Sequence, residues 1–275
     1  MKIAALSWGT NNIGDDVQSV AVMQHLPPVD VFIPRDHLDA YDGERALLVM
    51  NGWFLEEPRN WPPSDRIVPI FFGFHLHKKA RASVSEHVEY LRRHEPIGCR
   101  DRPTMEFVQS LGVEAYFSGC ATLTFDAPAD RAPDSFYLVE PDRSMPIGAL
   151  DVPDDLAVRN VSHRLVAVPL DLRMQFAREM IATYGRTASY VVTSRIHCAM
   201  PCVAMGIPTL FTGPVGRRTS IIDEAGIPRL AQPKLLDRLK RPAKVPLPER
   251  VDISALKRKI TEDLRGRIAK ALAEG

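Results

Sequence analysis

The chain has 275 residues, which is enough for one large domain or for two smaller ones that each hold a hydrophobic core. Its formal net charge is only +1, so the composition gives no support to an electrostatic nucleic-acid binder. No apolar run reaches the roughly 18 residues of a membrane-spanning helix, and we interpret the N-terminal MKIAALSW as a first strand, not a signal peptide. We expect a cytoplasmic protein without a transmembrane segment, and leave open its association with the inner face of the membrane.

The first half of the chain alternates predicted strands with predicted helices. Helical spacing indicates one helix through Val17, Val20 and Ala21, a second at 79–93, and a third that Asp101 caps and Gly112 ends. Such alternation is typical of a mostly parallel sheet with helices on both faces. Short apolar runs predict strands at 2–7, 29–33, 46–50, 67–72, 97–100, 113–117 and 122–125.

A proline-bearing stretch, 126–134, is the predicted linker to a second half. Beyond it, an amphipathic helix is expected at 172–185, and the chain ends in another amphipathic helix with Leu or Ile at every fourth position from Leu256 to Leu272. Strands are predicted at 136–140, 164–170, 188–193 and 207–211. We therefore divide the chain into an N-terminal Rossmann-like domain (1–127), a C-terminal one (134–230), and a proline-rich connection with the C-terminal helix (231–275).

The central unit of the second half is a strand, a helix and a short strand within 188–213. Its helix is apolar on every face, which predicts a buried helix, and only the first turn is polar. There Ser194 is a natural N-cap, and Arg195 and His197 follow where free backbone N–H groups favour an anion. Arg195 and His197 are either a ligand site or solvated helix-end residues, and their place at the carboxyl end of a strand favours the site.

Other polar residues have two interpretations each. Asp15 and Asp16 either orient substrate hydroxyls, with Asp15 as a base, or cap a helix, and Asn12 either contacts a ligand or holds the turn. His75 and His77 are two residues apart, so in a strand their side chains would share one side. With Lys78 and Lys79 beside them, they would line a cleft from the N-terminal half. The pair lacks a third metal ligand at suggestive spacing, so we expect no metal site.

Two further candidates concern an acceptor or a phosphate. Trp53 lies near a predicted strand end, where its ring either stacks on a sugar or is buried between layers. Arg217 and Arg218 follow a glycine-bearing turn, where they either meet phosphate or form a solvated basic loop. The four cysteines form no C-x-x-C pair and sit in apolar contexts, which indicates core thiols in a reducing compartment.

Four short motifs make the chain resemble the polysaccharide pyruvyl transferase family. In chain order these are Asn12-Ile13-Gly14-Asp15, Cys99-Arg100-Asp101, Gly119-Cys120-Ala121-Thr122-Leu123-Thr124, and Ser194-Arg195-Ile196-His197 with Gly206-Ile207-Pro208. The resemblance departs from the family at Met50-Asn51-Gly52-Trp53, where members often carry a glycine-rich turn. It implies an α/β fold of two Rossmann-like halves in a GT-B-like arrangement, with a cleft between them.

The resemblance also implies a reaction. Phosphoenolpyruvate would be the donor and co-substrate, no cofactor would be needed, and pyruvate would become a ketal on two hydroxyls of a saccharide, with a lipid-linked acceptor left open. Arg100 and Arg195 would bind the donor's carboxylate and phosphate, with Ser194, His75 and His77 nearby, and His197 would be the catalytic acid or base. Guanidinium forks and a helix N-terminus suit so small and anionic a donor.

Two other functions fit the same fold. One is a nucleotide-sugar glycosyltransferase, which the lack of an acidic ribose-binding residue after the central helix disfavours. The other is a non-catalytic glycan-binding relative, which the joint presence of Arg100, Arg195 and His197 disfavours. The sequence indicates neither the sugar nor the oligomeric state.

Overall fold

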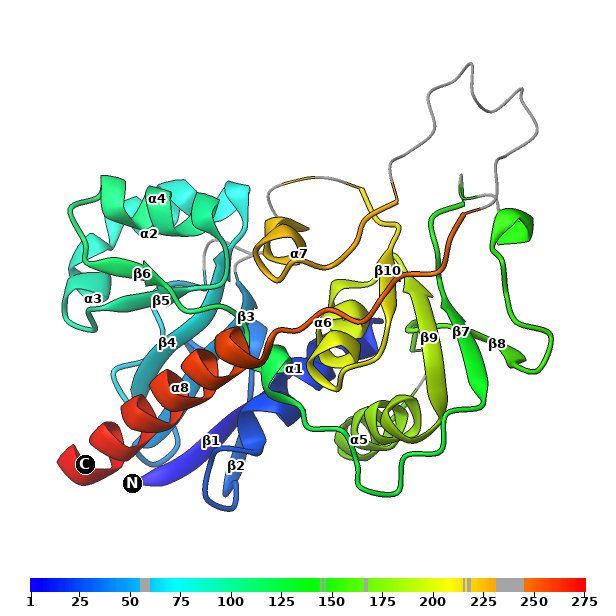
Figure 1. Ribbon diagram of the computed structural model, residues 1–275. Coiled ribbons are helices and arrows are strands. Elements are labelled where there is room, and N and C mark those ends of the chain that lie inside the picture. Colours follow the sequence, from blue (N-terminus) through cyan, green and yellow to red (C-terminus); the bar gives the residue numbers. More distant parts are fainter. Residues whose placement is uncertain are drawn as a thin grey trace.

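The structure, a computed structural model, describes residues 1–54, 60–143, 145, 147–165, 168–214, 216, 219–230 and 245–275. It contains one six-stranded and one four-stranded sheet, and every pair of neighbouring strands in both runs parallel (Figure 1). The expected α/β fold with two Rossmann-like halves is therefore confirmed. The predicted domain boundaries at 127 and 134 stay a prediction, although the connection between the sheets does include 126–134.

The N-terminal sheet has the strand order β2-β1-β3-β4-β5-β6. The order reverses at β1, which lies between β2 and β3, and open α/β sheets bind ligands at the carboxyl ends of strands at such a point. The strands are β1 (Lys2–Ser7), β2 (Val31–Pro34), β3 (Ala46–Phe54), β4 (Ile67–Leu76), β5 (Ile97–Cys99) and β6 (Ala115–Phe117). The α-helices of this half are α1 (Ile13–Met23), α2 (Arg81–Glu86), α3 (Val88–Arg92) and α4 (Arg102–Ser110). Short 3₁₀ turns occur at η1 (Arg35–His37), η2 (Lys78–Ala80) and η3 (Ala121–Thr124).

Two predictions for the N-terminal half are corrected. The single helix expected at 79–93 is two short helices that meet at His87. The strand expected at 122–125 is the 3₁₀ turn η3, in which the Thr124 hydroxyl donates to the carbonyl of Ala121 over 2.7 Å. The side-chain oxygen of Asn51 accepts the Ala121 N–H over 3.3 Å, and so satisfies a backbone group that a strand would have paired.

The C-terminal sheet has the order β10-β9-β7-β8 and again reverses, here between β7 and β9. Its strands are β7 (Ser135–Val139), β8 (Ala157–Val161), β9 (Ala188–Thr193) and β10 (Thr209–Phe211), and its helices are α5 (Leu170–Thr187), α6 (Ile196–Ala204) and α7 (Ser220–Glu224), with a 3₁₀ turn at η4 (Ile147–Ala149). The strand expected at 164–170 is wrong: β8 comes earlier, and its residues are largely exposed at the sheet edge, so it lacks an apolar pattern. Residues 166–167 lie outside the described part.

Helix α6 is buried along its whole length, as its all-round apolar sequence predicts, and Pro201 lies inside it. The C-terminal helix α8 (Ser254–Glu274) returns to the N-terminal half and packs along β4 and η3 (Figure 1). Lys257 at its start donates to the carbonyl of Ala204 over 3.1 Å and to that of Phe125, which ties α8 to the end of α6. Within the described residues, no helix combines the length and apolar character needed to cross a membrane.

The apolar stripe of α8 is buried as predicted at Ile260, Leu264 and Ile268, whereas Leu272 is 39% exposed. Leu264→Ala should therefore lower the free energy of unfolding by about 2–5 kcal/mol, because it leaves a cavity in a packed interface. Leu272→Ala is the matched control on the same helix and should change it by less than about 0.5 kcal/mol. Urea unfolding measures both. Equal effects of the two substitutions would contradict the packing of α8.

Candidate functional site

The polar first turn of α6 borders a cavity of about 170 Å³ to which both halves contribute. Asn12 and Gly14 come from the turn into α1, and Ser194, Arg195 and His197 come from the segment after β9. The N-termini of α1 and α6 thus meet at this cavity, and each brings the positive end of a helix dipole. Asn12 also caps α1, since its side-chain oxygen accepts the Gly14 N–H over 3.2 Å.

Arg195 stands at the carboxyl end of β9 and its guanidinium is held from one edge. Its Nε donates to a carboxylate oxygen of Glu140 over 2.6 Å, while the side chain is 35% exposed. The Arg195 backbone N–H donates to the Thr193 hydroxyl over 2.9 Å. The prediction that Ser194 caps α6 is wrong: Arg195 is at the cap position, and the Ser194 hydroxyl donates instead to the backbone carbonyl of Glu140.

Glu140, at the carboxyl end of β7, is a site residue that the sequence analysis missed. It has a left-handed backbone, with φ of 42°, although it is not glycine. Burial raises the pKa of its carboxyl, but bonds from Arg195, Ser162 and the His163 backbone and the charge of Arg195 together hold that pKa below its ordinary value. The signal was present, because Glu140 ends a correctly predicted strand just as Ser194 and Arg195 follow another.

His197 is 2% exposed and lies where three elements converge. A Cβ added at Gly14 would be 3.1 Å from the Cβ of His197, a tight contact that would push α1 and α6 apart by a few tenths of an ångström. The Nε2 atom of His197 is 3.4 Å from Nη1 of Arg100. Because a guanidinium only donates hydrogen bonds, Nε2 is the acceptor in this contact and carries no proton in this arrangement.

Arg100, which follows β5, is fully buried between the halves. Its Nη1 also donates to the side-chain oxygen of Gln18 over 3.3 Å, but its Nε and Nη2 have no hydrogen-bond partner. An unpaired buried donor costs about 1–3 kcal/mol, and more when it is charged. Such a cation is a candidate anion site, and because Arg100 is fully buried, a ligand reaches it only if the residues that cover it move.

The two aspartates of α1 point away from the cavity. Asp15 is 4% exposed and accepts from the Thr10 hydroxyl over 2.6 Å and from the Gln18 amide over 3.3 Å. Asp16 forms a buried ion pair with Arg173 of α5 over 2.7 Å, which joins the halves. Burial raises the pKa of Asp16 by more than the bonds and charge of Arg173 lower it.

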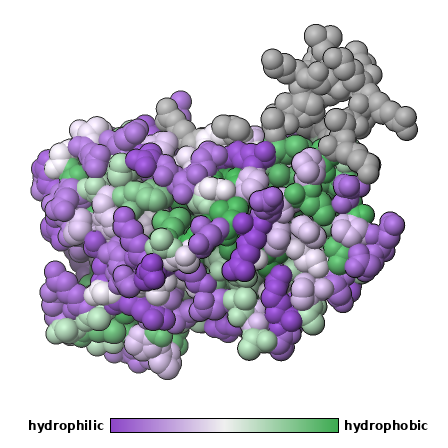
Figure 2. All heavy atoms as spheres, viewed as in Figure 1, coloured by the Kyte–Doolittle hydropathy of each residue, from purple (hydrophilic) through white to green (hydrophobic). Residues whose placement is uncertain are grey.

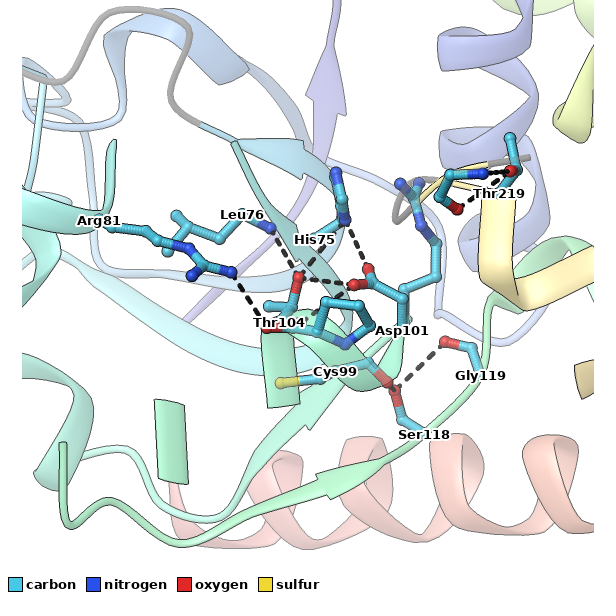
Figure 3. A network of polar contacts seen from close by, with 12 residues as sticks. His75, Leu76, Arg81, Cys99, Asp101, Thr104, Ser118, Gly119 and Thr219 are labelled. Atoms are coloured by element: carbon cyan, nitrogen blue, oxygen red, sulfur yellow. Dashed lines mark hydrogen bonds and ion pairs between the residues drawn. The ribbon is translucent and has the colours of Figure 1, made fainter. Parts of the chain in front are cut away.

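His75 and His77 line a second cavity, of about 260 Å³, at the carboxyl end of β4. His75 Nδ1 contacts the Asp101 carboxylate at 2.5 Å, and Thr104 donates to the same carboxylate at 2.9 Å (Figure 3). Trp53 also lines this cavity, with its ring perpendicular to that of His77 at 5.5 Å. Of the predicted donor residues, Ser194 and Arg195 thus line one cavity and His75 and His77 line the other, while Arg100 lines neither.

Asp101 also caps α4, as predicted, by accepting the Thr104 N–H over 3.0 Å. Burial raises the pKa of its carboxyl, yet the hydrogen bonds and charges of His75, Arg100 and Thr104 hold that pKa below its ordinary value. Arg217 and Arg218 lie outside the described residues. Among the residues described, no cluster of three His, Cys, Asp or Glu side chains could hold a metal ion, and the four cysteines are all buried and free.

The sequence model of one family, polysaccharide pyruvyl transferase, matches residues 12–214, a span that includes both helix N-termini, Arg100 and Arg195. The chain belongs to this family. Among curated proteins none matches the sequence. The family is one of transferases that act in polysaccharide biosynthesis.

Solved structures support the fold. A functionally uncharacterised protein of Klebsiella pneumoniae aligns with a TM-score of 0.54 at 14% identity, over 84% of this chain and 93% of that one. The UDP complex of Staphylococcus aureus MnaA aligns with a TM-score of 0.42 at 12% identity, over 98% of this chain and 88% of MnaA. The first of these shows a shared fold and no more.

The Asp101 network predicts a pH dependence of stability. Asp101→Asn should lower the free energy of unfolding at pH 7 by about 1–3 kcal/mol, because a buried charged hydrogen bond is lost. Since the folded pKa lies below the unfolded value of about 3.9, the contribution of the carboxylate is fully present above that value and is lost as the pH falls through the folded pKa. Urea unfolding of both proteins should therefore give a difference that shrinks only below about pH 4. A difference that is unchanged in acid would contradict the assignment.

Proposed function

We propose that the protein transfers pyruvate from phosphoenolpyruvate to two hydroxyls of one saccharide, as a ketal. In this reaction the donor's methylene carbon gains a proton and becomes a methyl group, both acceptor oxygens bond to C2, and inorganic phosphate leaves. The two acceptor hydroxyls lose two protons: one is matched by the proton that the methylene carbon gains, and the other leaves with phosphate. The family supports pyruvyl transfer to a polysaccharide in general.

One observation supports the donor: two arginines with unsatisfied guanidinium groups flank His197. Arg100 leaves Nε and Nη2 unpaired although it is fully buried, and no described residue accepts from the Nη groups of Arg195. Phosphoenolpyruvate carries a carboxylate and a phosphate, so two forks from opposite halves match its two anionic ends. Donor contact with Arg100 requires the residues around it to move.

His197 is the proposed acid–base group. It contacts Arg100 and follows Arg195 by two residues, and its Nε2 accepts from the Arg100 guanidinium in the ligand-free arrangement. An anion that takes the Arg100 donors would release Nε2 to receive a proton from an acceptor hydroxyl. The arginines themselves neutralise the leaving phosphate, so the proposal needs no metal or other cofactor.

The second cavity is the proposed place of the acceptor. It is lined by Trp53, an aromatic residue of the kind that packs against sugars although Arg35 already lies over its ring at 5.0 Å, and by the polar side chains of His75 and His77. From the sequence alone, His75 and His77 are assigned to donor binding. The proposal assigns them to the saccharide instead. Asp15 becomes a supporting residue of α1, because its bonds are made with Thr10 and Gln18.

Ligand-dependent unfolding and His197→Ala test the proposal together. Phosphoenolpyruvate at about 100 times its dissociation constant should stabilise the folded protein by roughly 2.7 kcal/mol, and nucleotide sugars should not. His197→Ala should lower kcat for phosphate release with a saccharide acceptor by about 100-fold or more, with a smaller change in donor affinity.

Each alternative gives a different result. Stabilisation by a nucleotide sugar instead of phosphoenolpyruvate would indicate a glycosyltransferase. Donor binding without phosphate release across a panel of saccharides would indicate a non-catalytic relative. Normal turnover by His197→Ala would remove that residue from the chemistry.

A further inference from the structure

Glu140 occupies the reversal point of the C-terminal sheet. It follows β7, the strand that pairs with β9, and Arg195 follows β9, so the two side chains leave adjacent strand ends. Its φ of 42° is a left-handed conformation that is unfavourable for a non-glycine residue and that persists only where the surroundings enforce it. The structure therefore retains a strained glutamate at the point where a ligand is expected.

The Glu140 carboxylate has a full set of donors. One oxygen accepts from Arg195 Nε over 2.6 Å and from the His163 backbone N–H over 3.3 Å, and the other accepts from the Ser162 hydroxyl over 2.9 Å. Its backbone carbonyl accepts from Ser194. These bonds leave the carboxylate no free role as a ligand group, but they fix its position accurately relative to Arg195.

The bond to Nε determines which edge of the Arg195 guanidinium is free. With Nε occupied, the two Nη groups form the remaining edge, and no described residue accepts from them. Arg195 also lines the cavity at the start of α6. A long arginine side chain that is 35% exposed would otherwise sample several rotamers, so one charged anchor reduces the entropy lost when an anion binds.

The same carboxylate also reaches the other half of the molecule through one residue. The His163 backbone, held by Glu140 at its N–H, accepts the Ile13 N–H at its carbonyl over 3.0 Å. Leu165 N–H donates to the Asn11 carbonyl over 3.1 Å, and Asn12 and Arg164 form an isolated antiparallel bridge. Glu140 is thus two hydrogen bonds from the N-terminus of α1, which forms the opposite wall of the cavity.

We propose that Glu140 is a positioning residue, which anchors Arg195 by its Nε so that both Nη groups face the anionic donor, and which aligns this fork with the α1 wall through the Ser162–Leu165 segment. The proposal rests on the proposed function for the identity of the donor. In this proposal Glu140 transfers no proton. Removal of its carboxylate should therefore weaken donor binding, and the effect should depend on the presence of Arg195.

The kinetic test is a double-mutant cycle. Glu140→Ala should raise the KM for phosphoenolpyruvate by about 10-fold or more and change kcat much less, since a charge-assisted hydrogen bond that preorganises binding is lost. In an Arg195→Ala background the same substitution should change KM by less than about 2-fold. Glu140→Gln, whose amide oxygen can still accept from Nε, should fall between wild type and Glu140→Ala, and is the variant to use if Glu140→Ala does not fold.

Asp223→Ala is the matched control. In the same half, the Asp223 carboxylate pairs with Nε of Arg229 over 2.5 Å, as the Glu140 carboxylate pairs with Nε of Arg195. Its removal should leave KM and kcat unchanged. A Glu140 effect of equal size with and without Arg195, or one on kcat alone, would overturn the proposal, because it would indicate a structural or catalytic role.

Crystal structures of wild type and Glu140→Ala give a readout that is independent of the donor. The proposal predicts that the Arg195 guanidinium leaves its position or becomes disordered in the variant, while α6 is unchanged. An Arg195 fork that keeps its position without Glu140 would overturn the proposal. If wild type neither binds phosphoenolpyruvate nor releases phosphate from it, the proposed function fails, and these structures still decide whether Glu140 positions Arg195.

Discussion

The structure depends on the close approach of two helix N-termini, those of α1 and α6. Gly14 favours it, because a Cβ there would be only 3.1 Å from the Cβ of His197. The approach brings the two halves together at the carboxyl ends of β1 and β9, and it is reinforced by the Asp16–Arg173 ion pair and by the bond from Ile13 to His163. The cavity between the halves is lined mainly by polar residues, while the apolar helix α6 is buried along its length. Hydrophilic residues cover much of the face that Figure 2 shows, with hydrophobic residues between them.

Polar groups are buried at this junction at a cost to stability. Arg100 is enclosed with two unpaired donors, Glu140 holds a strained backbone, and Asp101 needs His75 and Thr104 to remain ionised. Selection for stability alone would favour apolar residues in place of Arg100 and Asp101, and glycine in place of Glu140. Their concentration at the strand ends of both sheets, within the span that matches the pyruvyl transferase family, is the physical reason to place the function here.

The sequence predicts the local structure well where apolar residues follow a clear period. β1, β9, α6 and the stripe of α8 are all found as expected, and Asp101 caps α4. The misses have identifiable causes: β8 lies at a sheet edge without an apolar face, η3 is held by the distant Asn51 side chain, and the Ser194 hydroxyl bonds Glu140 instead of capping α6. The sequence motifs correctly single out Arg100 and His197, which are in contact. The pairing of Glu140 with Arg195 and the separation of His75 from His197 arise only from the packing of strands that are far apart in the sequence.

The central claim is that Arg100 and Arg195, from opposite halves, form one anion site for the donor. The most direct measurement combines calorimetric titration of phosphoenolpyruvate with thermal unfolding of wild type and Arg100→Met, which replaces a buried cation with an apolar side chain of similar length. If the unpaired donors of Arg100 exist for the ligand, the variant should lose donor binding while its unfolding temperature stays the same or rises, because the unsatisfied donors are gone. Unchanged phosphoenolpyruvate binding by Arg100→Met, or a large fall in its unfolding temperature, would contradict the account.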